Sequence, residues 1–298
     1  MANTAVADPN AGLSQAQLAA KYGLSVAGAR PSLPEYARRL WSYRYFIAAY
    51  ANARVEVSFS NTRLGRLWQV LTPLTNAAIY FLIFGVVIGT NDTVPNFIPY
   101  LCTGLFIFNF TQAVALAGIQ AITGNLGLIR ALHFPRGCLP IAVTLTQFQN
   151  LLASIAVLMV IVLVTGEPLT VQWLLIVPAL LLQSIFNVGA AMALARLGSK
   201  LTDLKQLIPF VMRTWMYASG VLYSTALFEE HLPAVVADIM HLNPLLIYIE
   251  MARDALVDSA PLALPSPQLW LLGVGWALLT GIGGFVYFWR GEQEYGRG

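Results

Sequence analysis

Long apolar segments, separated by short polar ones, dominate this chain. Six of them run for about 20 residues or more, enough to cross the ~30 Å hydrocarbon core of a bilayer as helices. They occupy residues 68–89, 97–121, 139–164, 171–195, 207–228 and 269–289. Since apolar runs of this length are rare in soluble domains, the pattern predicts an all-α, polytopic membrane protein with six transmembrane helices.

The segment before the first span is amphipathic rather than uniformly apolar. On a helical wheel, residues 35–50 gather tyrosine and aliphatic side chains on one face, with arginines opposite and at its edges. This pattern is typical of a helix that lies in the membrane interface. Two interpretations stay open, a simple membrane anchor and an entrance for a lipid head group. The residues expected to contact a head group are Arg38, Arg39, Trp41 and Arg44.

Two shorter apolar pieces follow the fifth predicted span. Residues 232–241 and 244–257 are each too short to cross a bilayer. Asn243 and Pro244 suit the cap and the first turn of the second piece. We therefore expect short re-entrant helices in the last outer loop.

Composition and charge support a membrane location. Apolar residues make up 57% of the chain and charged residues 10%, whereas about a quarter of a soluble domain is charged. Basic residues concentrate on the side of the spans that holds both termini, while the opposite side has a single one, Arg253, among acids such as Glu167 and Glu250. The positive-inside rule then predicts the cytoplasmic (inner) membrane, with both termini in the cytoplasm. The net charge of +3 is a topology signal, and no nucleic-acid partner is expected.

The chain is expected to form one membrane domain. Residues 35–290 make up this domain, with a mobile cytoplasmic tail at 1–34 and a short tail at 291–298. No phosphate-binding loop occurs, because Gly198-Ser199-Lys200 lacks the preceding glycine spacing. No set of His and Cys residues at ligand spacing predicts a metal site. We therefore expect no cofactor in this chain, and ATP and Mg²⁺ in a partner subunit.

The loop between the second and third spans is the candidate link to that partner. Asn125 suits the N-cap of a short helix there and Pro135 its end. A rigid, half-apolar helix can seat in a groove on a partner and transmit a rigid-body motion. An amphipathic turn that rests on lipid is the alternative. The residues expected to couple are Leu126, Leu128, Ile129, Arg130, His133, Phe134 and Arg136.

Polar and aromatic residues recur at helical spacing in the first and fifth spans. A buried arginine is costly in hydrocarbon, so Arg213 is expected to face water, a partner or an anionic substrate group. Aromatic faces and hydrogen-bonding groups together suit a channel for sugars. The alternative is helix packing, which we expect of Gln147, Gln149 and Asn150. The predicted pathway residues are Asn76, Tyr80, Phe84, Arg213, Tyr217 and Tyr223.

Four stretches carry a family resemblance. They are FSNTRLGRLWQVLTPL at 59–74, NLGLIRALHFPRGCLP at 125–140, LIPFVMRTWMYASGVLYS at 207–224 and NPL at 243–245. In this order, with six spans, they resemble the membrane subunits of ABC-2-type polysaccharide exporters, the permeases for O-antigen, teichoic acid or galactan. The resemblance covers residues from about 35 to 290. One departure is that Gly220 and Ser224 stand where the family has prolines in the fifth span.

The resemblance implies a transporter subunit rather than an enzyme. It implies export of a polyprenyl-diphosphate-linked polysaccharide to the cell envelope, with a second copy of this chain and two copies of an ATP-binding subunit as partners. An ABC-2 exporter of a drug or small lipid is the first alternative. An integral membrane glycosyltransferase is the second, and a secondary transporter is a third, although no inverted repeat is visible.

Overall fold

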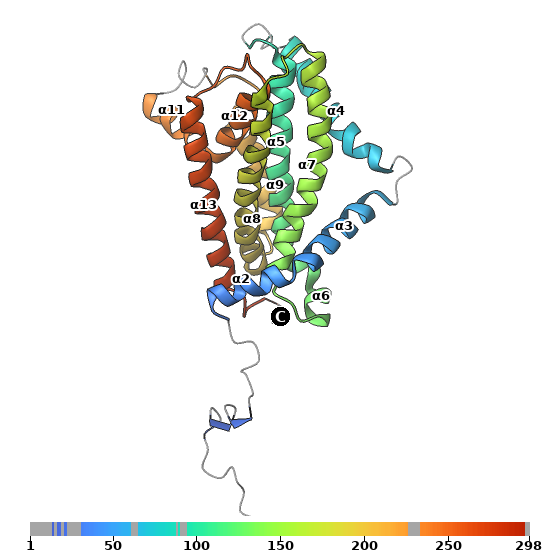
Figure 1. Ribbon diagram of the computed structural model, residues 1–298, viewed down its shortest axis with the longest axis vertical. Coiled ribbons are helices and arrows are strands. Elements are labelled where there is room, and N and C mark those ends of the chain that lie inside the picture. The colour runs from blue at the N-terminus through green and yellow to red at the C-terminus, as the bar shows by residue number, and fades with distance from the viewer. Residues whose placement is uncertain are drawn as a thin grey trace, which may run out of the picture.

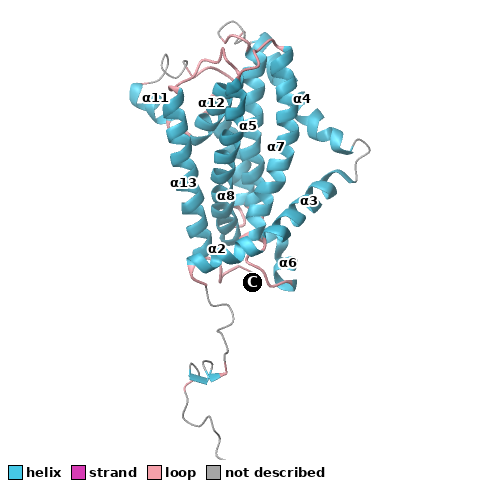
Figure 2. Cartoon of the chain, in the orientation of Figure 1, coloured by secondary structure: helices cyan, strands magenta, loops and turns pink. Residues whose placement is uncertain are grey.

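The computed structural model describes residues 14, 17–18, 21–22, 31–60, 65–87, 89, 94–225 and 233–295 of the chain. Across these residues the protein is helical and contains no strand (Figure 2). A bent helix pair between residues 235 and 256 makes a sixth span if it is counted as one. In the same part of the chain, five helical segments are long and apolar enough to cross a membrane: Val70–Val87, Phe97–Gly118, Cys138–Val164, Val171–Lys200 and Ser266–Arg290. The predicted class, an all-α polytopic membrane protein, is confirmed.

The helices follow most of the predicted segments. The N-terminal segment forms two helices, α2 (Leu33–Ser42) and α3 (Arg44–Ser60), rather than the single helix predicted over residues 35–50. The first span combines an α-helix, α4 (Trp68–Tyr80), with a π-helix, η2 (Phe81–Val87). The remaining elements are η1 (Gly65–Leu67), α5 (Phe97–Gly118), η4 (Thr123–Asn125), α6 (Leu126–Ala131), α7 (Cys138–Val164), η5 (Val171–Leu175), α8 (Ile176–Lys200), α9 (Leu204–Tyr217), α11 (Ala234–His241), α12 (Pro244–Leu256) and α13 (Ser266–Arg290).

The long helices pack side by side into one bundle. Figure 1 shows α2, α6 and the described C-terminus at one end, which we call the α6 end, and α11 with α12 at the other, the α11 end. The central helix is α5, which packs against α7, α8 and α12. In the most apolar stretch of α5, 72% of the residues are buried, whereas in Val70–Val87 of the first span only 11% are. The first span is therefore the least covered by the rest of the chain.

Helices α8 and α13 make the most extensive contact in the bundle. A β-carbon built on Gly189 would lie 2.0 Å from the carbonyl oxygen of Thr280. One built on Gly284 would lie 2.1 Å from the carbonyl oxygen of Gly189. Only glycine fits at these two positions, because the helix backbones approach each other directly, as small residues allow inside membranes.

The fifth predicted span, residues 207–228, contains a shorter helix than expected. Helix α9 has 14 residues, which is about 21 Å of rise against a ~30 Å hydrocarbon core. The helix ends at Tyr217, and the turn that follows it contains Gly220, whose φ of +57° is left-handed and favours glycine. Arg253 of α12 donates to the carbonyl oxygen of Gly220 at 3.0 Å and to that of Val221 at 3.2 Å. A side chain from outside the segment thus binds carbonyl groups that a longer helix would use.

Helices α11 and α12 match the two short pieces predicted at 232–241 and 244–257. They meet at 65°, and both lie at the α11 end (Figure 1). The side chain of Asn243 accepts from the backbone amide of Leu245 at 3.1 Å, so the predicted cap is confirmed. The same side chain donates to the carbonyl oxygen of Ala218 at 2.9 Å, which ties the start of α12 to the end of α9.

Candidate functional site

A cavity of about 390 Å³ lies between α4, α5 and α7, at the depth of the spans. Its distinguishing feature is a set of side-chain amides, each of which offers two donors and an acceptor. The Nδ2 of Asn150 donates to the Oε1 of Gln147 at 3.1 Å, and aromatic rings such as Trp68 and Phe106 line the same space. Amides are costly in hydrocarbon, so this wall is suited to a hydroxyl-rich ligand. The amides are Asn76, Asn109, Gln112, Gln147 and Asn150, and we call this space the amide cavity.

A second cavity, also of about 390 Å³, continues from the first toward α3. The two share Ala113 and Leu116 in their lining, and the second adds Arg54 and Asn125. The Asn125 side chain accepts from the Tyr50 hydroxyl at 2.5 Å and does not cap α6. Asn125 thus stands at the predicted N-cap position of α6, but its side chain connects the loop to α3 instead of capping the helix.

The largest of these cavities, about 560 Å³, opens at the α6 end. Two groups that the sequence analysis treated separately meet in its wall. Arg39 comes from the predicted head-group set on α2. Four members of the predicted coupling set line it as well: Ile129, His133, Phe134 and Arg136. The third contributor, the turn of residues 291–295 after α13, was predicted to be only a short tail; we call it the tail turn.

Glu292 of the tail turn is the centre of this wall. Its carboxylate accepts from the Tyr36 hydroxyl at 2.7 Å and from the backbone amide of Arg136 at 3.0 Å, and its carbonyl oxygen accepts from the Arg136 guanidinium. The Tyr36 hydroxyl also accepts from the amide of Gly137 at 3.1 Å. Burial raises the pKa of the Glu292 carboxyl, opposed by the bonds from Arg136 and Tyr36. Burial, followed by the nearby carboxylate, raises the pKa of Tyr36.

The other predicted head-group residues lie on the exposed face of α2 and at the start of α3. Arg38 is exposed, and Trp41 is 71% exposed. Arg44 stacks over the ring of Tyr45 at 4.4 Å and over that of Trp41 at 5.6 Å. A cation held among exposed rings fits a helix at the membrane interface.

The predicted coupling residues lie between 126 and 136, which we call the coupling segment. This segment has one face turned toward the bundle and one exposed face. Ile129 is buried and packs with Leu139 and Phe288 of the bundle, so it faces this chain rather than a partner. Leu132 is 51% exposed, and His133 is exposed as well. Leu126 and Leu128 are half-buried, Arg130 is exposed, and Phe134 packs against Phe46 of α3 with ring centroids 5.1 Å apart. The surface open to a partner is therefore formed by the end of α6 and the residues that follow it.

The predicted pathway residues of the first span lie along α4 and η2. Asn76 lines the amide cavity. Tyr80 and Phe84 are half-buried, with ring centroids 6.3 Å apart. The α4 helix packs against α5 and α7. One of the three predicted residues thus contributes to a described cavity.

The pathway residues of the fifth segment form a separate group. Arg213 and Tyr217 are exposed on α9. The Tyr223 hydroxyl donates to the carbonyl oxygen of Tyr217, and the Tyr223 carbonyl oxygen accepts from the Tyr100 hydroxyl at 3.2 Å. These contacts place Tyr223 beside α5, while Arg213 and Tyr217 point out of the single chain.

A buried arginine on α12 is a feature that the sequence analysis missed. Arg253, counted there as an outer-loop charge, is 0% exposed. Its guanidinium carbon lies 3.4 Å from the ring centroid of Tyr100. Together with its bonds to the carbonyls after α9, this contact joins α5, α9 and α12. The available signal was a lone arginine in a short apolar piece, which at membrane depth marks a structural or functional site.

Comparison with known proteins places the chain in a family. Residues 47–257 match the ABC-2 type transporter family. The chain is 25% identical over 214 residues to the O-antigen export system permease protein RfbA of Klebsiella pneumoniae, which covers 72% of this chain and 80% of that protein. It is 25% identical over 193 residues to the protein of the same name from Myxococcus xanthus, covering 65% and 74%.

A third relative is the polysialic acid transport protein KpsM of Escherichia coli. It is 24% identical over 206 residues, covering 69% of this chain and 78% of that protein. The family match runs from α3 to the end of α12 and so includes the amide cavity, the coupling segment and Arg253. The chain belongs to the ABC-2 type transporter family, as a membrane subunit.

Proposed function

We propose that this subunit exports a polysaccharide linked to polyprenyl diphosphate across the cytoplasmic membrane. Two copies of the chain work with two copies of an ATP-binding subunit, which binds ATP and Mg²⁺. The α6 end faces the cytoplasm together with both termini, and the α11 end faces outward. Similarity to permeases of O-antigen and polysialic acid transport supports this substrate class.

The observation that carries the proposal is the amide-lined cavity. Five amides and several aromatic rings surround a space of about 390 Å³ at membrane depth. Sugar hydroxyls can exchange hydrogen bonds along such a wall, and sugar C–H faces can stack on the rings. An exporter of a drug or small lipid is expected to have few hydrogen-bonding side chains in its lining, whereas five of the residues that line this cavity carry a side-chain amide.

A second copy of the chain is supported by the poor coverage of the first span. In the single chain, Leu82, Val86 and Val87 are all more than half exposed, and the amide cavity opens beside the same helix. A second copy packed near α4 would close the cavity from lipid. The channel would then form between copies rather than inside one.

Substitution of two cavity amides tests the proposal. Asn109→Leu and Gln112→Met remove hydrogen-bonding groups at similar side-chain size. Each should lower export about fivefold, since a net hydrogen bond contributes ~1 kcal/mol. Surface polysaccharide per assembled complex is measured in cells depleted of the native chain. The matched control is Gln149→Met, which removes an α7 amide that bonds Asn52 at 2.6 Å outside the cavity.

Depletion itself tests the substrate class. Cells without the chain should accumulate lipid-linked glycan inside and lose it from the surface. Undiminished surface polysaccharide after depletion contradicts the proposed function. Normal export per complex in both amide variants would instead show that the cavity does not contact the glycan.

A further inference from the structure

Three parts of the chain that are distant in sequence meet at the α6 end. They are α2, the linker of residues 132–137 between α6 and α7, and the tail turn. Tyr36 and Glu292 at the centre of this junction are 1% and 8% exposed. The hydrogen bonds that Tyr36 makes to Glu292 and Gly137 at the centre of the junction are therefore buried.

Helix α2 is held at its start, its middle and its end. The indole N–H of Trp289 donates to the carbonyl oxygen of Pro31, just before α2, at 3.0 Å. Tyr36 in the middle bonds Glu292 and Gly137, as described above. Directly after α2, the Tyr43 hydroxyl donates to the carbonyl oxygen of His133 at 3.2 Å. The start of α2 is thus bonded to the C-terminal region, its middle to both the tail turn and the linker, and its end to the linker.

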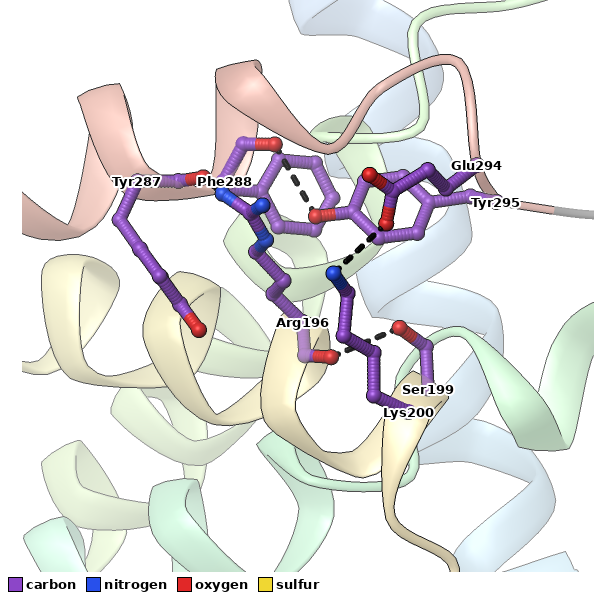
Figure 3. A network of polar contacts seen from close by, with 7 residues as sticks. All are labelled: Arg196, Ser199, Lys200, Tyr287, Phe288, Glu294 and Tyr295. Carbon is purple, nitrogen blue, oxygen red and sulfur yellow. Dashed lines mark hydrogen bonds and ion pairs between the residues drawn. The ribbon is translucent and has the colours of Figure 1, made fainter.

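The tail turn is in turn fixed to the bundle. Figure 3 shows Tyr295 folded back over α13, with its ring centroid 4.6 Å from that of Phe288 and its hydroxyl donating to the Phe288 carbonyl at 3.0 Å. In the same view Lys200, at the end of α8, pairs with Glu294 at 2.9 Å. The guanidinium of Arg196 stacks over the ring of Tyr287 at 4.3 Å. The turn is a folded element and not a loose tail.

Space at the junction is as restricted as its polar contacts. A β-carbon on Gly137 would lie 2.8 Å from the Tyr36 hydroxyl oxygen, and one on Gly291 would lie 2.6 Å from that of Tyr295. The linker and the tail turn therefore approach their tyrosines without room for a methyl group. These two tight contacts, together with the hydrogen bonds of Tyr36 and Glu292, link the segments directly even though a cavity opens beside them, and direct packing contacts transmit displacement.

We propose that Glu292 is a positioning residue that joins α2, the linker and the tail turn into one rigid unit, through which a displacement of α6 reaches α2. The inference rests on the proposed function and on the predicted role of α6 and its linker as the link to the ATP-binding subunit. It adds that the ATP-driven motion is delivered to the helix that carries the exposed Arg38 and Trp41, where a lipid head group would arrive.

The test follows α2 directly in the assembled complex. The full chain and its ATP-binding subunit are reconstituted in proteoliposomes, with Ala37→Cys on the exposed face of α2 carrying an environment-sensitive fluorophore. The native Cys102 and Cys138 are buried and replaced by alanine. We expect ATP with Mg²⁺ to change the fluorescence of the wild-type complex. Glu292→Ala and Tyr36→Phe should each reduce this change about fivefold or more, the lower end of the range for coupling between sites.

Two further variants separate transmission from folding. Glu292→Gln keeps an oxygen that accepts from the Arg136 amide, so it should retain part of the response. Glu294→Ala, in the same turn, removes only the exposed ion pair to Lys200 and should respond like the wild type. ATP hydrolysis by the complex should persist in all four variants.

The outcomes are distinct. Loss of the α2 response with ATP hydrolysis retained supports the inference. A full response in Glu292→Ala, an equal loss in Glu294→Ala, or no response in the wild type overturns it. Because the signal requires no glycan, these results do not depend on the export assay, which alone decides the proposed substrate class.

Discussion

Two buried glutamates perform similar tasks at opposite ends of the bundle. Glu167, near the α11 end, accepts from the Asn96 side chain at 2.7 Å, from the Asp258 amide at 3.0 Å and from the Ser259 hydroxyl at 3.0 Å. Glu292 joins three segments at the α6 end in the same manner. An ionised carboxylate has several acceptor positions, so one residue can tie together segments that share no helix contact.

The raised pKa of Glu292 predicts an unusual pH dependence. The folded state holds this proton more tightly than the unfolded state, whose carboxyl has a pKa of about 4.3. The free energy of unfolding should therefore fall as pH rises from that value through the raised folded-state pKa. Glutamine does not titrate, so Glu292→Gln should lack this pH-dependent part of the free energy of unfolding. Thermal unfolding midpoints of the purified proteins across this pH range measure the difference.

Glu294 supplies a control of opposite sign. Its hydrogen bond and charge interaction with Lys200 lower the pKa of its carboxyl. Its contribution should be present above the ordinary carboxyl pKa and be lost as pH falls through the folded-state value. Parallel pH profiles for the wild type and Glu292→Gln would contradict the assignment of a buried, proton-retaining carboxyl.

At the scale of elements, hydropathy predicts the helices whose ends are set locally. The bounds of α5, α7, α8 and α13 lie within a few residues of the predicted spans, because an apolar run and its flanking polar residues determine them. The end of α9 is different. The turn that follows it is bound by Arg253, which is 33 positions beyond Gly220 in sequence, so a short stretch of sequence around α9 does not contain this contact.

The candidate sites divide in the same way. Local sequence patterns predicted that helices form before the first span and in the loop between the second and third spans, where α2, α3 and α6 lie. The head-group and coupling roles of these helices stay predictions. The amides Asn109 and Gln112 were not singled out, and Gln147 and Asn150 were predicted to be helix contacts. The sequence around an isolated amide in an apolar run does not show which neighbour that face of the helix will contact. These amides line one wall only because α4, α5 and α7 are rotated so that they face the same space.

The two faces of the coupling segment lead to a prediction for α6 and its linker. Leu132→Asp should weaken binding of the ATP-binding subunit about 5- to 30-fold while the chain remains folded, since a docking contact of this kind contributes about 1–2 kcal/mol. Ile129→Asp should destabilise the chain itself by about 3 kcal/mol or more, because it buries an unpaired charge. Co-purified partner per folded chain, together with the unfolding midpoint, distinguishes these effects. Undisturbed partner binding in Leu132→Asp would exclude this surface as the docking site.

For the whole molecule, the arrangement of ends and charges agrees with a single orientation. The described parts of both terminal regions, α2 and the tail turn, lie at the α6 end with α6 itself (Figure 1). Most of the basic residues of the chain precede α4, follow α5 or α8, or follow α13. The positive-inside rule predicts that this end faces the cytoplasm.

Cysteine labelling checks this orientation. Thr170 is exposed just before η5. In a chain without native cysteines, Thr170→Cys should react with an impermeant thiol reagent added to intact cells. Gln293→Cys is exposed in the tail turn and should react only after the membrane is permeabilised. Labelling of both variants in intact cells would mean an odd number of crossings in the chain. Labelling of Gln293→Cys but not of Thr170→Cys would mean the opposite orientation.

The junction between Tyr36 and Glu292 also has a consequence for biosynthesis. The two residues are 256 positions apart, so translation at about 5–20 residues per second separates them by roughly 13–50 s. The linker is made partway through that interval, and until Glu292 follows, α2 and the linker lack the carboxylate that joins them. The surface that an ATP-binding subunit would dock against is therefore completed only when the last helix has been made. Late closure of this kind would keep an unfinished permease from recruiting an ATPase.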